Sequence, residues 1–161
     1  MPALIALTAV LSVSAFFVVW LSTTLLANIV LVWAVFLCWG TYFANGANME
    51  SIKLSLGALI LGIVLGQLAV ICIVNIPVST VTAAVWVAVF VAIFTYASKV
   101  KLFSVLPTTV YAFAMIFAYV LQTPDQLTME VLSAQDFTNP MLKLIASAIF
   151  GVAVGHGTNY L

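Results

Sequence analysis

Charged side chains are missing from two long stretches of the chain, residues 1–49 and residues 54–98. The second stretch alone would reach roughly 67 Å as one helix at about 1.5 Å per residue, whereas the hydrocarbon core of a bilayer is only about 30 Å thick. Each stretch is therefore expected to fold back on itself and cross a membrane twice. Long apolar runs without charge are typical of membrane-spanning helices.

Short polar breaks divide this pattern into six predicted membrane-spanning helices. The breaks contain Ser, Thr, Asn, Gly, Pro and Lys, which favour turns or interrupt apolar helices. The predicted spans cover residues 3–22, 25–44, 51–74, 78–98, 102–121 and 140–158. The first break, Ser22 to Thr24, is short, so five helices with a long kinked first element are the alternative. The pattern predicts an all-α, polytopic membrane helix bundle that forms one integral membrane domain over residues 1–161.

Composition strengthens the membrane prediction. Of the 161 residues, 66% are apolar and 5% are charged, whereas an ordinary soluble domain carries about 25% charged residues. The mean hydropathy is +1.32. A soluble surface cannot be built from this supply, so the lipid bilayer is the expected partner of most of the chain. No basic region precedes the first apolar segment, which argues against a cleaved signal peptide and predicts a retained first helix.

The few charges predict an orientation. In the six-helix arrangement Lys53, Lys99 and Lys101 share one side with both termini, and Lys143 is the one cation on the other side. Because cytoplasmic loops carry an excess of Lys and Arg, both termini are expected in the cytoplasm. Lys143 is expected to anchor its helix at the interface or to pair with Asp136. Glu50 and Lys53 are three residues apart and would face each other on a helix.

One sizeable loop, residues 122–139, is predicted on the external side. It begins with Thr123, Pro124 and Gln126, which have the spacing of a helix N-cap, a first-turn proline and a capping-box partner. A short helix lying on the external interface is therefore expected within this loop.

A short internal repeat links two of the predicted spans. The segment AVFLCWGTYFA, which begins at Ala34, matches AVFVAIFTYAS, which begins at Ala88, at an offset of 54 residues. Both copies would run in the same direction through the membrane. The match suggests a parallel hairpin repeat in which spans two and three correspond to spans four and five.

The repeat pairs Thr41-Tyr42 with Thr95-Tyr96, and both pairs fall at the cytoplasmic ends of their helices. The sixth span ends on the same side with further polar residues. Such a cluster suits a substrate vestibule, because a solute that leaves water needs replacement hydrogen bonds. It is also the ordinary composition of helix ends, where Tyr, Asn and Thr are common. The candidate solute-binding or pore-lining residues are Thr41, Tyr42, Asn45, Thr95, Tyr96, Ser98, His156, Thr158 and Asn159.

Small residues recur four apart on the third and sixth spans. Such spacing lets helix backbones approach closely, since lipid supplies no hydrophobic drive for helix association. The sequence leaves open whether the partner helix belongs to the same chain or to another copy. The predicted packing residues are Gly62, Gly66, Ser147, Gly151 and Gly155. Gln67 and Asn28, which would lie within spans three and two, are expected to form hydrogen bonds across helix interfaces.

A family resemblance rests on three features of the first half of the chain. The segment Trp39 to Gly46 reads WGTYFANG, the next helix begins with Ser51-Ile52-Lys53, and glycines follow at positions 57, 62 and 66. With these features the whole chain resembles a family of small bacterial inner-membrane proteins of unknown function, typified by YcdZ. More distantly, it is similar to the membrane half of fusaric-acid-resistance-type exporters. The resemblance implies a bacterial inner-membrane location and a polytopic helical fold.

The sequence offers no arrangement typical of an enzyme. His156 has no Ser, Cys or carboxylate nearby in sequence, and no phosphate-binding loop or basic nucleic-acid-binding patch is present. No catalytic residue, cofactor, metal or nucleic-acid partner is expected. The leading hypothesis is a channel or facilitator for a small neutral or weakly polar solute, formed within a homo-oligomer. A non-transporting structural or accessory subunit and a proton-coupled exporter that uses His156 or Glu50 are the alternatives.

Overall fold

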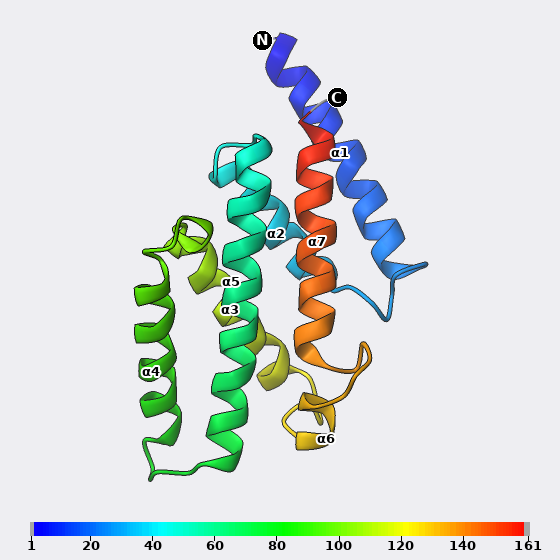
Figure 1. Cartoon of the computed structure of the whole chain (residues 1–161). Helices are drawn as coiled ribbons and strands as arrows, with labels where there is room; N and C mark the ends of the chain where they lie inside the picture. Colours follow the sequence, from blue (N-terminus) through cyan, green and yellow to red (C-terminus); the bar gives the residue numbers. More distant parts are fainter. Residues whose placement is uncertain (1, 160–161) are drawn as a thin grey trace.

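Six long helices follow one another in the predicted order (Figure 1). The computed structural model describes residues 2–159, and within this range the chain is helical and contains no strand. The long helices are α1 (Pro2–Thr23), α2 (Val32–Ala44), α3 (Met49–Asn75), α4 (Thr82–Ala97), α5 (Leu106–Gln122) and α7 (Pro140–Thr158). A 3-10 turn, η1 (Lys101–Phe103), precedes α5, and a short helix, α6 (Met129–Leu132), lies before α7. The predicted all-α helix bundle is confirmed.

The long helices fall into two classes by length. α1, α3 and α7 are long and apolar enough to cross a membrane, by length and composition. α2, α4 and α5 are shorter apolar helices of 13, 16 and 17 residues. The apolar runs therefore predicted the number and order of the long helices but overestimated the length of three of them.

The predicted second span was wrong in its first part, because helix α2 begins at Val32 rather than at residue 25. Residues 24–29 form turns instead. The hydroxyl of Thr24 donates to the carbonyl of Trp20, and the N–H of Leu26 donates to the carbonyl of Leu21. These bonds satisfy two backbone carbonyl groups at the end of α1. Asn28, predicted inside a span, is exposed in this connection.

The connection between α1 and α2 lies at mid-height in the bundle (Figure 1). The N–H of Leu31 donates to the hydroxyl of Ser147 over 2.9 Å. Ser147 follows Pro140, the first residue of α7, by about 10 Å along the helix axis. The connection therefore lies well above α6 and the lower ends of α3 and α4 in Figure 1. α2 runs beside only the later part of α7.

Glycines hold two parallel helix pairs together at the centre of the bundle. A Cβ atom added to Gly62 would meet Thr109 and Ala112 of α5, and one added to Gly66 would meet Ile116. In the same way, Gly151 lies against Val35 and Cys38 of α2, and Gly155 lies against Trp39 and Tyr42. The sequence left the packing partner open, and the structure places it within the same chain.

The two outer helices differ from this centre. α4 packs against α3 and α5, where Phe94 contacts Phe113 with ring centroids 5.4 Å apart. α1 packs beside α2 and α7 and is exposed along most of its length. α3 therefore lies at the centre of the bundle, where it contacts α2, α4, α5 and α7.

Helix α6 is attached to the bundle through a buried amide. Gln67 is buried, and its Nε2 donates to the carbonyl of Leu132 over 2.8 Å and to Oδ1 of Asn139 over 3.2 Å. Asn139 is the N-cap of α7, so Gln67 joins α3 to both α6 and α7. The expected hydrogen bond of Gln67 across helices is present, although its partners lie in the loop and at a helix start.

The short helix predicted in the loop is present but begins later than predicted. Its N-cap is Thr128, whose hydroxyl accepts from the N–H of Val131, and not Thr123. Asp125 has a φ of 60°, in the left-handed region. This conformation is incompatible with the first turn of a right-handed helix, so the capping-box pattern at Thr123 does not start one.

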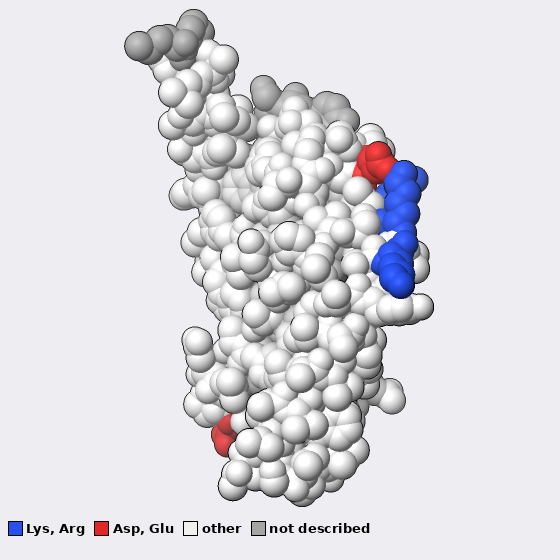
Figure 2. All heavy atoms as spheres, turned by 90° about the vertical axis from the view of Figure 1, so that its left-hand side faces the viewer, with Lys and Arg blue, Asp and Glu red and all other residues white. Residues whose placement is uncertain are grey.

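Lysine side chains gather along one edge in the upper half of the bundle, beside an acidic side chain, and another acidic side chain lies near the lower end (Figure 2). The half of the bundle that carries both ends of the described chain also carries Lys53, Lys99 and Lys101, as predicted. The pairing predicted for Glu50 was wrong. Glu50 forms its ion pair with Lys101, at 2.6 Å, rather than with Lys53. Lys143 donates to the hydroxyl of Tyr119 over 3.3 Å.

Candidate functional site

The predicted vestibule residues fall into three separate sets, of which the first joins α2 to α7. The hydroxyl of Tyr42 and Nδ1 of His156 lie 3.1 Å apart, and the two rings meet edge to face. Tyr42 is fully buried. Asn159, just after α7, donates from Nδ2 to the carbonyl of Ala47 over 2.9 Å. The hydroxyl of Thr158, also buried, donates to the carbonyl of Gly155.

The second set joins α2 to α3 and α5 through Asn45. Its Nδ2 donates to the hydroxyl of Ser55 over 2.8 Å and to the hydroxyl of Thr108 over 3.1 Å. Ser55 and Thr108 are buried. The side chain of Thr41, one turn earlier, is buried and donates to the carbonyl of Cys38. Asn45 therefore ties three helices together at the end of the bundle that carries the termini.

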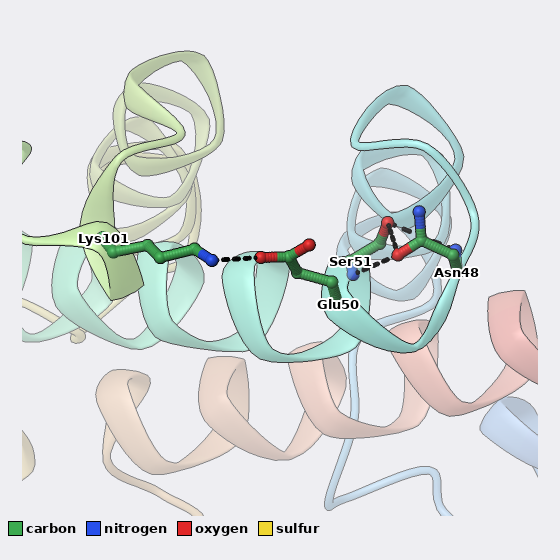
Figure 3. A network of polar contacts seen from close by, with 4 residues as sticks. All are labelled: Asn48, Glu50, Ser51 and Lys101. Atoms are coloured by element: carbon green, nitrogen blue, oxygen red, sulfur yellow. Dashed lines mark hydrogen bonds and ion pairs between the residues drawn. The ribbon is translucent and has the colours of Figure 1, made fainter.

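A capping box fixes the turn after Asn45 (Figure 3). Oδ1 of Asn48 accepts from the N–H of Ser51 over 2.9 Å, and the hydroxyl of Ser51 accepts from the N–H of Asn48. The same hydroxyl donates to the carbonyl of Asn45 over 2.7 Å. Gly46 has a φ of 106°, which a glycine adopts without strain. The turn from α2 to α3 is thus rigidly bonded, which sets the position of Asn45.

The third set, on α4, does not join the other two. Thr95 is exposed, and Ser98 donates to the carbonyl of Thr95 over 2.7 Å. Tyr96 is 70% exposed and lies under the ammonium group of Lys99. The repeat paired Tyr96 with Tyr42, which is fully buried. The two copies share direction but not environment, because α2 lies against α7 whereas α4 lies at the edge of the bundle.

A groove between α2 and α5 was not predicted. Two adjoining cavities, of about 490 Å³ and about 170 Å³, share Trp33, Leu37 and Ala118 in their walls. We call this feature the α2–α5 groove. The residues that line it are Trp33, Leu37, Tyr111, Ala114, Met115, Ala118, Tyr119, Gln122 and Thr123.

The α2–α5 groove is polar at one end and apolar along its length. Its mouth holds Gln122, Thr123 and Tyr119, beside the loop that follows α5. The hydroxyl of Tyr119 accepts a hydrogen bond from Lys143. Beyond Tyr111, the same face of α5 reaches Thr108, which accepts the hydrogen bond from Asn45. The groove thus leads from the end of the bundle that holds the loop after α5 toward the hydrogen bond between Asn45 and Thr108.

A sequence signal for this groove exists in α5. Polar residues recur on one face of that helix at Thr108, Tyr111, Tyr119 and Gln122, at spacings close to whole turns. The other wall could not be inferred, because α2 begins at Val32 among contacts with distant residues, such as that of Leu31 with Ser147, which lies 116 positions away in the chain.

Two charged groups outside the membrane-spanning segments have shifted pKa values. Hydrogen bonds from the hydroxyl and the N–H of Thr138 lower the pKa of Asp136, and Lys143 adds a smaller contribution. The hydrogen bond to Glu50, and then its charge, raise the pKa of Lys101. Both shifts stabilise the charged form of the group.

The fold and its apolar helices define a polytopic helical membrane protein. The chain belongs to the family described as "Protein of unknown function (DUF1097)", whose family model matches residues 10–161. No curated protein and no solved structure shows significant similarity to the chain.

Proposed function

We propose that this protein facilitates passage of a small neutral or weakly polar solute across the bacterial inner membrane, along the α2–α5 groove. The observation that carries the proposal is the groove itself, which combines polar groups at its mouth with apolar walls beyond. A solute that leaves water exchanges hydrogen bonds with Tyr119, Gln122 and Thr123, and then contacts Leu37, Met115 and the Tyr111 ring. Binding sites for small molecules commonly combine apolar walls with a few polar groups.

In this proposal Asn45 closes the groove at the end that carries the termini. Its two hydrogen bonds to Ser55 and Thr108 hold α2 against α3 and α5. Opening requires that these bonds break, and water entering the gap replaces them. Thr41 and Tyr42 then act by positioning α2, while the α4 residues Thr95, Tyr96 and Ser98 take no part.

Both termini lie in the cytoplasm in this proposal, because the lysine-rich end of a bundle faces the cytoplasm. The groove mouth then faces the periplasm. The groove is open along its side between α2 and α5, so a homo-oligomer would shield a polar solute from lipid. No catalytic residue, metal or cofactor is assigned.

The experiment is solute flux into liposomes that contain the purified protein, followed by stopped-flow light scattering with glycerol, urea and butane-1,2-diol as probes. Ala118→Trp places an indole in the groove and is expected to reduce flux by at least about ten-fold. Ala92→Trp adds the same side chain to an exposed position of α4 and serves as the control. Asn45→Ala is expected to raise the rate, because the closed end loses both hydrogen bonds.

The proposal fails if flux with the wild-type protein equals that of protein-free liposomes for all three probes. It also fails if Ala118→Trp folds and transports like the wild type.

An accessory membrane subunit is the second candidate function. The observation that favours it is α1, which is apolar and exposed along most of its length, with Leu4, Ile5 and Phe16 each about two-thirds exposed. Lipid covers such a face in the bilayer, and a partner helix that packs closely against it would replace that lipid. Flux at the protein-free level, together with a partner that co-purifies only when α1 is intact, would favour this function. A proton-coupled exporter, which the more distant family resemblance suggests, has less support because Glu50 is a surface residue paired with Lys101.

A further inference from the structure

A cavity of about 480 Å³ lies between the start of α3 and η1, on the surface that carries most of the lysines. Figure 2 shows the lysine side chains close together on this surface. The walls are formed by Met49, Glu50, Lys53, Leu54, Lys101 and Leu102. We call this cavity the lysine pocket. Three of its residues are charged and three are apolar, so a ligand that fills it contacts both kinds of group.

Positive charge is in excess around the lysine pocket. Lys53 and Lys101 lie in its walls, Lys99 lies two positions before Lys101, and the nearest carboxylate is Glu50. The Glu50–Lys101 ion pair, drawn in Figure 3, joins side chains that are 58% and 82% exposed. An exposed pair of this kind has little net strength. The ammonium group of Lys101 therefore remains available to a second anion.

The apolar walls decide which kind of anion fits. Met49 is 63% exposed and Leu102 is 44% exposed beside the charged groups. A free inorganic anion gains nothing from these side chains, whereas an amphiphile buries apolar surface against them. The wall also has a fixed shape, because a Cβ added to Gly57 would lie 2.6 Å from the carbonyl oxygen of Leu102. This close contact holds η1 against α3.

We propose that the lysine pocket binds an anionic phospholipid. The headgroup phosphate lies between Lys53 and Lys101, and the upper part of an acyl chain lies along Leu54 and Leu102. Lysines at the membrane surface attract anionic lipids, and each contributes about five-fold to the binding constant. This proposal is independent of the proposed function, since the lysine pocket and the α2–α5 groove have no residue in common.

The experiment measures lipid binding to the full-length protein in detergent by native mass spectrometry. Phosphatidylglycerol is compared with phosphatidylcholine of the same acyl chains. The wild-type protein is expected to prefer phosphatidylglycerol. The double variant Lys53→Gln/Lys101→Gln is expected to bind it roughly 25-fold more weakly. Lys143→Gln, which removes a lysine at the other end of the bundle, is the matched control and is expected to retain the preference.

Glu50→Gln gives a test of the opposite sign. Removal of this carboxylate releases Lys101 and reduces the local negative charge, so phosphatidylglycerol is expected to bind more tightly than to the wild type. A purely structural role of the Glu50–Lys101 pair would not produce tighter binding. Thermal unfolding of each variant in the same detergent identifies any variant that fails to fold.

Three results would overturn the proposal. One is equal binding of phosphatidylglycerol and phosphatidylcholine to the wild type. Another is an unchanged preference in a folded Lys53→Gln/Lys101→Gln variant. The third is displacement of phosphatidylglycerol by glycerol phosphate at matched concentration, which would identify a site for a soluble anion instead of a lipid.

Discussion

The backbone N–H of Leu31 donates a hydrogen bond of 2.9 Å to the side-chain hydroxyl of Ser147. Ser147 is fully buried and donates in turn to the carbonyl of Lys143, one turn earlier in α7. This relationship fixes the start of α2 beside the middle of α7. The length of α2, the depth of the connection before it and one wall of the α2–α5 groove all follow from where α2 begins.

Removal of the Ser147 hydroxyl is expected to destabilise the protein. Ser147→Ala leaves the Leu31 N–H without its acceptor, at a cost of about 1–2 kcal/mol in the free energy of unfolding. Thermal or denaturant unfolding in detergent measures this change. Ser12→Ala, which removes a hydroxyl from the exposed face of α1, should change the stability by much less. Equal stability of Ser147→Ala and the wild type would contradict the role given to this bond.

The depth of the α1–α2 connection predicts a labelling pattern. A cysteine at Asn28, in a background without Cys38 and Cys72, is expected to react with a membrane-impermeant maleimide far more slowly than a cysteine at Thr128. Asn28 lies shortly before Leu31, whose N–H is hydrogen-bonded to Ser147 in the middle of α7. Thr128 lies in the exposed loop before α6. Similar rates from the same side would show that the connection reaches the membrane surface.

The same reagent tests the orientation. In intact spheroplasts a cysteine at Thr128 is expected to react, whereas one at Gly157 is expected to react only after the membrane is permeabilised. The two positions lie at opposite ends of the bundle and are both exposed. Labelling of both positions from one side would contradict the assignment of the termini to the cytoplasm.

Two glycine-to-alanine substitutions distinguish the effect of helix packing on stability from the effect of helix propensity. Gly62→Ala is expected to destabilise the protein by about 1–3 kcal/mol, because the added methyl group meets the α5 backbone at Thr109 and Phe113. Gly40→Ala is the matched control, since nothing lies within 4 Å of the added atom. Alanine favours a helix over glycine by about 1 kcal/mol, so the control should be neutral or stabilising. Denaturant unfolding should therefore show a loss of stability for Gly62→Ala and none for Gly40→Ala, and equal effects would contradict the close packing of α3 on α5.

Much of the fold could be predicted because the apolar runs and polar breaks are local signals. Residues such as Asn45-Gly46 and Asn75 to Pro77 do end helices, and the small residues at Gly62 and Gly151 do mark close helix contacts. The start of α2 could not be predicted in this way. Residues 25–31 are mostly apolar, and a contact made where α2 begins is with Ser147, far away in the chain.

The candidate site was predicted only in part, for the same reason. The sequence predicted that Tyr42, Asn45 and His156 lie at the same end of the bundle. This prediction was possible because the number of preceding spans gives the direction of each helix. It could not tell that Tyr96 would remain exposed, since the repeat records similarity of sequence and not the face that each helix turns to its neighbours. Tyr42 and Tyr96 share a motif, yet one is fully buried and the other is 70% exposed.

Asp136 predicts a pH effect in the loop before α7. Its carboxylate accepts hydrogen bonds from the hydroxyl and the N–H of Thr138, which lower the pKa of the carboxyl group below the ordinary value of about 3.9. These bonds stabilise the loop above that ordinary value, and the stabilisation is lost as the pH falls through the lowered pKa. Thr138→Val removes the hydroxyl donor and is expected to raise the pKa of Asp136.

NMR titration of carboxyl-labelled aspartate measures this change directly. The chain contains two aspartates, Asp125 and Asp136, so Asp125→Asn leaves a single signal to assign. An identical titration midpoint for Asp136 with and without the Thr138 hydroxyl would contradict the assigned cause.

Reversible block of the α2–α5 groove tests most directly whether solute moves along it. Ala118→Cys, in a background without Cys38 and Cys72, is reconstituted into liposomes and glycerol flux is measured before and after reaction with benzyl methanethiosulfonate. If solute moves along the groove, the flux falls at least about ten-fold and is restored by a reducing agent, while Ala92→Cys on α4 is unaffected. Full flux through the modified Ala118→Cys protein, with complete labelling shown by mass spectrometry, would contradict movement along the groove.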